Sequence, residues 1–116
     1  MNDFYTIHEL QPSLDSLSCI IVFNGSHHIF DGHFPGQPVV PGVCMVQMVK
    51  ELLQQQFDKS LILRSTGQIK FLQLITPEVM PEIHISWKET DNGYLVNAGF
   101  KKDTDLFKLT GTFEIL

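Results

Sequence analysis

The sequence predicts an α+β fold, in which an antiparallel sheet of about five to six strands wraps around one central helix. Three observations support this prediction. One segment, residues 43–57, is rich in helix formers and contains neither glycine nor proline. The first half of this segment is apolar on nearly every side, so we expect it to be covered on every side. The segments that follow it alternate apolar and polar residues with a period of two, which is typical of strands.

The chain has the length of one small domain. Its 116 residues can bury a core but leave little room for a second domain. There is no internal repeat, low-complexity tract or linker, so we place no boundary and expect a single domain over residues 1–116. In a domain of this size, a curved sheet is the structure best able to cover a helix that is apolar all round.

The N-terminal third predicts two strands and then a long irregular segment. Residues 4–10 have a mild preference for strand, and residues 18–23 form a dense apolar run that ends at Asn24 and Gly25, as a buried strand would. Residues 26–42 contain three prolines and three glycines, which exclude a regular helix or a central strand. Because apolar residues are interspersed among them, we expect a packed loop, where functional sites are commonly built.

The chain after the helix predicts strands up to its end. Residues 61–63 and 68–75 are expected to form one long strand with a bulge near Gly67, ended by Pro77. Asp91, Asn92 and Gly93 are a strong hairpin signal between two of the later strands. The remaining strands are predicted over residues 83–87, 94–100 and 107–115.

Composition and charge exclude several classes of protein. The net charge of −5 argues against nucleic-acid binding, which needs clustered lysine and arginine. No apolar run approaches the roughly 20 residues of a membrane span. The N-terminus lacks the pattern of a signal peptide, and Cys19 and Cys44 are too few for a disulfide framework, so a cytoplasmic protein is expected. Charged residues make up only 18% of the chain, below the usual share of about 25%, which indicates surface hidden in an oligomer interface.

The loop before the helix contains the candidate catalytic residues. It contains His33 and leads directly into the helix N-terminus at Gly42 and Val43. The first N–H groups of a helix have no internal acceptor and lie at the positive end of its dipole. A carbonyl held on these groups has a more acidic α-proton, because they stabilise the enolate charge where it develops. A neutral histidine is the usual base at pH 7, so the residues indicate proton abstraction α to a thioester.

The string HFPGQPVVPGV, residues 33–43, resembles the signature of the FabZ/FabA-type 3-hydroxyacyl-[acyl-carrier-protein] dehydratases. This resemblance implies a hot-dog fold and a dimer that converts a 3-hydroxyacyl thioester to the trans-2-enoyl thioester and water, in biosynthesis of the fatty-acid, polyketide or pigment type. By position, it implies that His33 is the base and that the N–H of Gly42, with Val43, holds the thioester carbonyl. The backbone carbonyl of Val39 would orient the imidazole. The carrier would be acyl carrier protein or coenzyme A.

Gln47 departs from the family pattern. The family has a carboxylate fourteen positions after the histidine, supplied by the neighbouring subunit, and this chain has an amide there. An amide cannot exchange a proton near pH 7, although it can hold a hydroxyl or a water. Three interpretations stay open. Gln47 positions a water while His33 shuttles the proton; Glu51, one turn later, reaches back as a substitute acid; or the chain is a thioesterase, an acyl-binding protein or the partner of an active paralogue in a heterodimer.

Other candidate residues are assigned to packing or to the carrier. His27 and His28 lack the accompanying ligands of a metal site, so we expect no metal and no cofactor. Cys44 is expected in the core rather than as a nucleophile. Met45, Met48 and Phe71 are candidates for an acyl tunnel. An acidic carrier protein would need a local basic patch, for which the candidates are Arg64, Lys70, Lys101 and Lys102.

Overall fold

Six strands and one long helix make up the described chain, which comprises residues 3–31 and 36–116 of the computed structural model. The helix α1 spans Gly42–Phe57, and a short 3-10 helix, η1, spans His28–Phe30. The strands are β1 (Tyr5–Pro12), β2 (Ser16–Phe23), β3 (Leu61–Phe71), β4 (Glu82–Thr90), β5 (Gly93–Lys102) and β6 (Thr104–Ile115).

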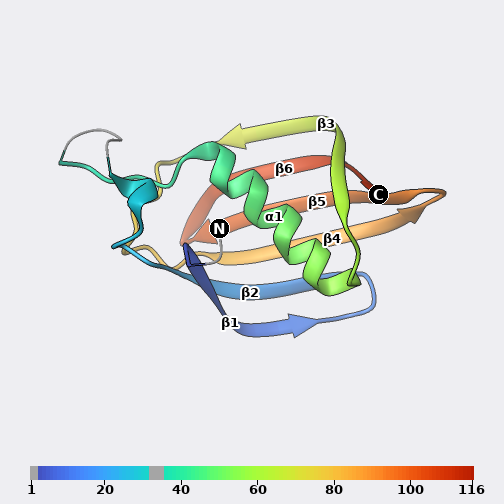
Figure 1. Ribbon diagram of the computed structural model, residues 1–116, viewed down its shortest axis with the longest axis horizontal. Coiled ribbons are helices and arrows are strands. Elements are labelled where there is room, and N and C mark those ends of the chain that lie inside the picture. The colour runs from blue at the N-terminus through green and yellow to red at the C-terminus, as the bar shows by residue number, and fades with distance from the viewer. Residues whose placement is uncertain (1–2, 32–35) are drawn as a thin grey trace.

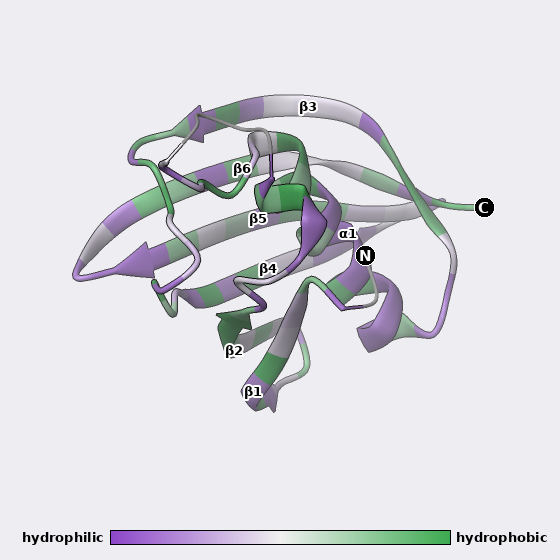
Figure 2. Ribbon diagram, turned by 60° about the vertical axis from the view of Figure 1, so that its left-hand side comes forward, coloured by the Kyte–Doolittle hydropathy of each residue, from purple (hydrophilic) through white to green (hydrophobic). Residues whose placement is uncertain are grey.

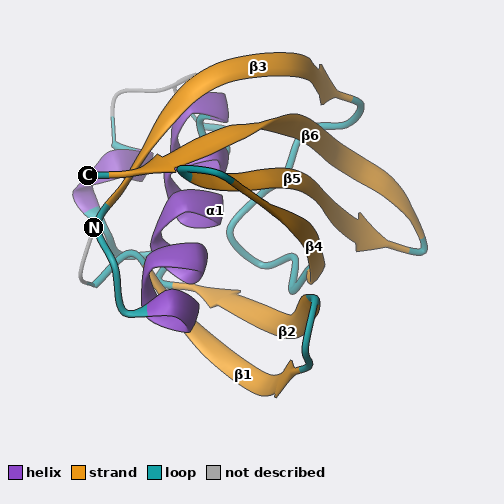
Figure 3. Cartoon of the chain, turned by 90° about the vertical axis from the view of Figure 1, so that its right-hand side faces the viewer, coloured by secondary structure: helices purple, strands orange, loops and turns teal. Residues whose placement is uncertain are grey.

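The strands form one antiparallel sheet that curls around α1. Their order is β1-β2-β4-β5-β6-β3, so β1 and β3 are the two edges. The helix lies across the concave face of the sheet (Figure 1), and the two edges bend toward it from opposite sides (Figure 3). The predicted α+β class, with a sheet wrapped around one helix, is therefore confirmed.

The core lies between the concave face of the sheet and one side of α1. Alternate residues of β2, β4 and β5 are buried, which Figure 2 shows as alternating bands of hydropathy along the strands. The helix contributes six buried side chains to this core: Cys44, Met45, Met48, Val49, Leu52 and Leu53.

The other side of α1 is open. Val43 is 79% exposed, and Val46 and Gln47 are only partly covered. The expectation that the helix is covered on every side is therefore wrong for a single chain. The physical reason is that the sheet curls around only one side of the helix (Figure 3).

The edge strand β3 differs from its prediction at its end. Its ladder with β6 is irregular between Leu63 and Ser65 and again between Thr66 and Gln68, which confirms a bulge near Gly67. The strand ends at Phe71 rather than Ile75. After that point the N–H of Leu72 still bonds to Leu106 of β6, and only Ile75 has a new partner, because its carbonyl accepts the N–H of Val40 at 2.7 Å. The loop before α1 is thus paired with the segment after β3.

The stem of the long loop is anchored by His27, which is 7% exposed. Its Nδ1 accepts the N–H of Ile29 at 3.0 Å and caps η1, and its Nε2 lies 3.0 Å from a carboxylate oxygen of Asp3. The imidazole also packs edge-on against Phe4, with ring centroids 5.3 Å apart. His27 therefore has a structural role in holding the loop stem against the core.

Candidate active site

The N-terminus of α1 lies at the open end of an apolar groove. The groove has a volume of about 450 Å³ and is bounded by the loop before α1, the first turn of α1 and the segment after β3. The N–H of Val40 donates to the carbonyl of Ile75. This bond holds the loop before α1 beside the segment after β3, and the two form the base of the groove. The lining residues are Val39, Val40, Pro41, Gly42, Met45 and Phe71 to Ile75.

Gly42 is the point where the groove meets the helix backbone. Pro41, the N-cap, has no N–H and makes no side-chain cap, and its carbonyl accepts the N–H of Cys44 at 3.0 Å. A Cβ on Gly42 would lie 2.7 Å from Cε1 and 2.8 Å from Cζ of Phe71, so the absence of a side chain lets that ring lie against the helix start. The ring of Phe71 is nevertheless 57% exposed, and it forms the wall of the groove rather than part of the core.

The sequence-predicted site residues are placed as follows. Val39, Gly42 and Val43 lie together at the start of α1, with Val39 buried and Val43 exposed. Gln47 lies just over one turn further along, on the partly covered side of the helix. His33 lies outside the described residues.

Glu51 is hydrogen-bonded both to Gln47 on α1 and to Tyr5 on the edge strand β1. The Nε2 of Gln47 donates to Oε2 of Glu51 at 3.1 Å, and the hydroxyl of Tyr5 on β1 donates to Oε1 at 2.8 Å. Both helix residues were candidates from the sequence, and their spacing of four permits this contact. Tyr5 was not among the candidates, because nothing in the sequence shows which β1 side chain meets the helix.

Two titratable groups near Glu51 have raised pKa values. Burial, and then the hydrogen bond to Glu51, raises the pKa of Tyr5 well above its ordinary value. Burial and the nearby Glu51 carboxylate also raise the pKa of the Cys44 thiol. A buried thiol with a raised pKa is a poor nucleophile, which agrees with packing as the role of Cys44.

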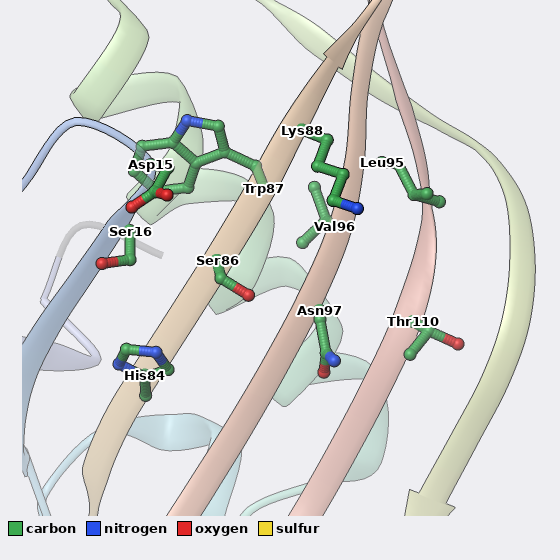
Figure 4. A pocket seen from close by; sticks show the side chains of 10 residues that line it. All are labelled: Asp15, Ser16, His84, Ser86, Trp87, Lys88, Leu95, Val96, Asn97 and Thr110. Carbon is green, nitrogen blue, oxygen red and sulfur yellow. The ribbon is translucent and has the colours of Figure 1, made fainter.

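A second groove lies on the outer face of the sheet, away from α1. It has a volume of about 520 Å³, and its polar side chains, among them His84, Ser86 and Asn97, project from β4 and β5 on the side opposite the helix (Figure 4). Within residues 3–31 and 36–116, no group of three or more His, Cys, Asp or Glu residues is arranged to hold a metal. No helix in these ranges is long and apolar enough to cross a membrane.

The fold and the groove together define a class of protein. One helix inside a curled antiparallel sheet is the hot-dog fold, and here an apolar groove opens at the N-terminus of that helix. The model of the ApeI-like family, ApeI dehydratase, matches residues 9–108. The chain therefore belongs to the ApeI-like dehydratase family.

Curated relatives agree with this family. The chain is 28% identical over 94 residues to the 3-hydroxyacyl-[acyl-carrier-protein] dehydratase FabZ of Lactobacillus helveticus, over 74% of this chain and 63% of that protein. It is 31% identical over 78 residues to FabZ of Levilactobacillus brevis, over 61% of this chain and 52% of that protein. The matched region thus spans between about half and three-fifths of the length of these relatives.

Solved structures with the same fold include a chain of the dehydratase heterocomplex ApeI:P from Xenorhabdus doucetiae. It superposes with a TM-score of 0.79 at 20% identity, over 95% of this chain and 97% of that chain. A conserved protein from Pseudomonas aeruginosa superposes with a TM-score of 0.64 at 14% identity, over 93% and 89%. These likenesses establish the hot-dog fold.

Replacing Gly42 by alanine is expected to impair the site without unfolding the protein. The new Cβ pushes the Phe71 ring aside, and because that ring is more than half exposed it can move at little cost. Alanine also favours helix over glycine by up to about 1 kcal/mol, so the midpoint of thermal unfolding should stay or rise. Any turnover at this site should fall by about 10- to 100-fold, because misplacing a reacting group by about 1 Å has effects of this size. Lower thermal stability with unchanged turnover would contradict this prediction.

Proposed function

We propose that this protein dehydrates 3-hydroxyacyl thioesters to trans-2-enoyl thioesters. The observation that carries the proposal is the apolar groove that opens at Gly42. A groove with this lining suits an acyl chain, and the helix N-terminus at its mouth suits a thioester carbonyl. Family membership over residues 9–108 gives independent support for a dehydratase.

The proposed reaction uses His33 first as a base and then as an acid. The N–H groups of Gly42 and Val43 hold the thioester carbonyl, and the carbonyl of Val39 orients the imidazole. His33 takes the C2 proton, the C2–C3 double bond forms, and the C3–O bond breaks. The proton on His33 passes to the departing oxygen, which leaves as water. The enolate charge that develops between these steps is stabilised by the helix N-terminus.

Gln47 of the partner subunit holds the 3-hydroxyl in this scheme, as the family pattern implies, because within one chain Gln47 lines a cavity separate from the apolar groove. An amide oxygen accepts the hydroxyl hydrogen, which turns a lone pair of the leaving oxygen toward the imidazolium of His33. Glu51 is the alternative source of a proton, since it hydrogen-bonds to Gln47. Either role is compatible with a slower or more specialised enzyme than one with a carboxylate at position 47.

The test is incubation of the purified protein with a 3-hydroxyacyl thioester of acyl carrier protein and, separately, of coenzyme A. Formation of the enoyl thioester, followed by its ultraviolet absorbance, supports dehydration. Release of free thiol without enoyl product would instead show a thioesterase. The absence of both activities in the isolated protein would overturn the proposal that this chain is an active enzyme alone.

A second candidate function is a subunit of a heterodimer. It is favoured by Gln47, which replaces a carboxylate that the family supplies across a dimer, and by the similarity to a chain of the ApeI:P heterocomplex. The open side of α1, where Val43 is exposed, is the surface that a partner subunit would cover, in a homodimer or with a paralogue. Enoyl formation that appears only after a carboxylate-bearing paralogue is added would favour this candidate.

A lysine cluster next to the groove is the proposed docking surface for an acidic carrier protein. Lys70 on β3 pairs in register with Lys108 on β6, directly beside Phe71, and Lys101 and Lys102 end the neighbouring strand β5. Arg64, which the sequence analysis grouped with them, lies toward the other end of the sheet, where its Nε donates to Glu114 at 3.0 Å. The cluster therefore consists of Lys70, Lys101, Lys102 and Lys108.

The double substitution Lys101→Glu/Lys102→Glu is expected to raise KM for an acyl-carrier-protein substrate about tenfold at low salt, because surface charge steers association. KM for the matching N-acetylcysteamine thioester, which lacks the carrier, should not change. The pair Lys59→Glu/Lys88→Glu changes the net charge equally, and neither residue lines the apolar groove at Gly42, so it serves as the control. Equal effects of the two pairs, or an effect on the small thioester, would contradict the docking surface.

A further inference from the structure

We infer that Glu51 and Tyr5 are positioning residues, which fix the amide of Gln47 so that its oxygen is presented to the 3-hydroxyl of a substrate bound in the groove of a partner subunit. This inference rests on the proposed function. It arises from a polar cavity of about 570 Å³ between β1 and α1, separate from the apolar groove. The side chains of Tyr5, Gln47 and Glu51 all line this cavity.

Each oxygen of the Glu51 carboxylate accepts a hydrogen bond from a described side chain. Tyr5 donates to Oε1 at 2.8 Å, and Gln47 donates to Oε2 at 3.1 Å. One donor comes from the edge strand and the other from the same helix, four residues earlier. Hydrogen bonds to a charged group are stronger than those between neutral groups, so the side chain of Glu51 is fixed from two directions.

This arrangement decides which way the Gln47 amide faces. A carboxylate offers only acceptor lone pairs, so the amide nitrogen must be the atom that meets it. A flipped amide would place two oxygen atoms against each other. The amide oxygen, on the other arm of the planar group, is then directed away from Glu51 and is the atom that a hydroxyl can approach. Glu51 thus makes Gln47 a hydrogen-bond acceptor of fixed direction.

Tyr5 keeps this arrangement in place over a wide range of pH. Its ring is half-buried and packs edge-on against Phe4, with ring centroids 6.4 Å apart. Because burial and the bond to Glu51 raise the pKa of Tyr5, the phenol stays protonated and continues to donate. Tyr5 on the edge strand therefore fixes the carboxylate of Glu51, and this carboxylate in turn fixes the amide of Gln47.

The test compares Tyr5→Phe and Glu51→Gln with Gln55→Ala, which alters the same cavity at an exposed position outside this set of hydrogen bonds. The ligands are the N-acetylcysteamine thioesters of a 3-hydroxyacyl group and of the same acyl group without the hydroxyl. We expect both variants to weaken binding of the hydroxylated thioester by about tenfold, near the upper end for one hydrogen bond between neutral groups, here the Gln47 amide and the 3-hydroxyl, and to leave the other ligand unchanged. The control should bind both like the natural protein.

A double-mutant cycle separates positioning from a structural role. In a Gln47→Ala background, Tyr5→Phe should have no further effect on the binding difference between the two thioesters, because it acts through Gln47. Equal losses for both ligands, or effects that add in the cycle, would overturn the inference while leaving dehydration intact. If the natural protein binds neither thioester and forms no enoyl product, the proposed function fails and this inference fails with it.

Discussion

Replacing His33 by alanine is expected to lower kcat/KM for dehydration by about 10³-fold or more. General acid–base catalysis by one positioned group typically contributes about 10²- to 10⁴-fold. In the proposed reaction the same imidazole removes the C2 proton and returns it to the leaving hydroxyl, so its loss affects both steps. Because no carboxylate stands at position 47 to take over either transfer, the residual rate should be only what substrate binding and the helix N-terminus provide.

The measurement is the initial rate of enoyl formation by the natural and variant proteins at several substrate concentrations. The His84→Ala variant is the control, because His84 is exposed on the outer face of the sheet, across from α1. Binding of the 3-hydroxyacyl thioester to His33→Ala should persist, since the groove and the helix N-terminus are unchanged. A variant that keeps full activity would remove His33 from the mechanism.

The same variant separates dehydration from thioester hydrolysis. If His33→Ala abolishes enoyl formation and thiol release is absent from both proteins, the histidine acts in dehydration and not in hydrolysis. If thiol release is the activity that disappears, His33 activates water instead, and the protein is a hot-dog thioesterase. The fold is common to both outcomes, so only the product distinguishes them.

The strands and the helix could be predicted because their signals are local. The helix was expected over residues 43–57 and begins one residue earlier, at Gly42. Ile83, Ile85 and Trp87 alternate with polar residues and are all buried. Such patterns follow from the direction of side chains along a strand, and they need no knowledge of the neighbours.

The groove and the Glu51 contacts could not be predicted because they depend on tertiary neighbours. The end of β3 was expected at Ile75, but the regular ladder ends at Phe71, and Ile75 pairs with Val40 in the loop before α1, which places the two segments that line the groove side by side. The i,i+4 spacing of Gln47 and Glu51 was visible in the sequence. Tyr5 meets Glu51 across 46 positions of sequence, and no local pattern indicates that contact.

Restoring a carboxylate by Gln47→Glu is expected to raise dehydration by about 10²- to 10⁴-fold, the usual contribution of a general acid. The structure gives a reason for a large gain. A carboxyl at position 47 would lie beside the carboxylate of Glu51, where the amide nitrogen now stands at 3.1 Å. Two carboxyls this close cannot both ionise easily, so the pair should hold one proton to a higher pH than an isolated glutamate.

The pH profile of Gln47→Glu tests this explanation. The neighbouring negative charge raises the pKa of the new carboxyl, so the gain should be full at low pH and should be lost as the pH rises through that raised pKa. The Gln55→Glu variant adds the same charge to the same cavity just over two turns after position 47, and it should give no gain. A gain that is equal for both variants would indicate a general effect of charge rather than a restored acid.

The exchange Gln47→Glu/Glu51→Gln carries this reasoning one step further. It keeps one carboxyl and one amide in contact but reverses their order, so the like charge that raises the pKa is absent. We expect the gain in rate to remain at low pH and to be lost at a lower pH than in the single variant, as measured by kcat against pH. If both variants stay inactive while the thioester still binds, a missing acid at position 47 does not limit this chain. The acid would then have to come from a carboxylate-bearing partner, and the heterodimer would become the better explanation of Gln47.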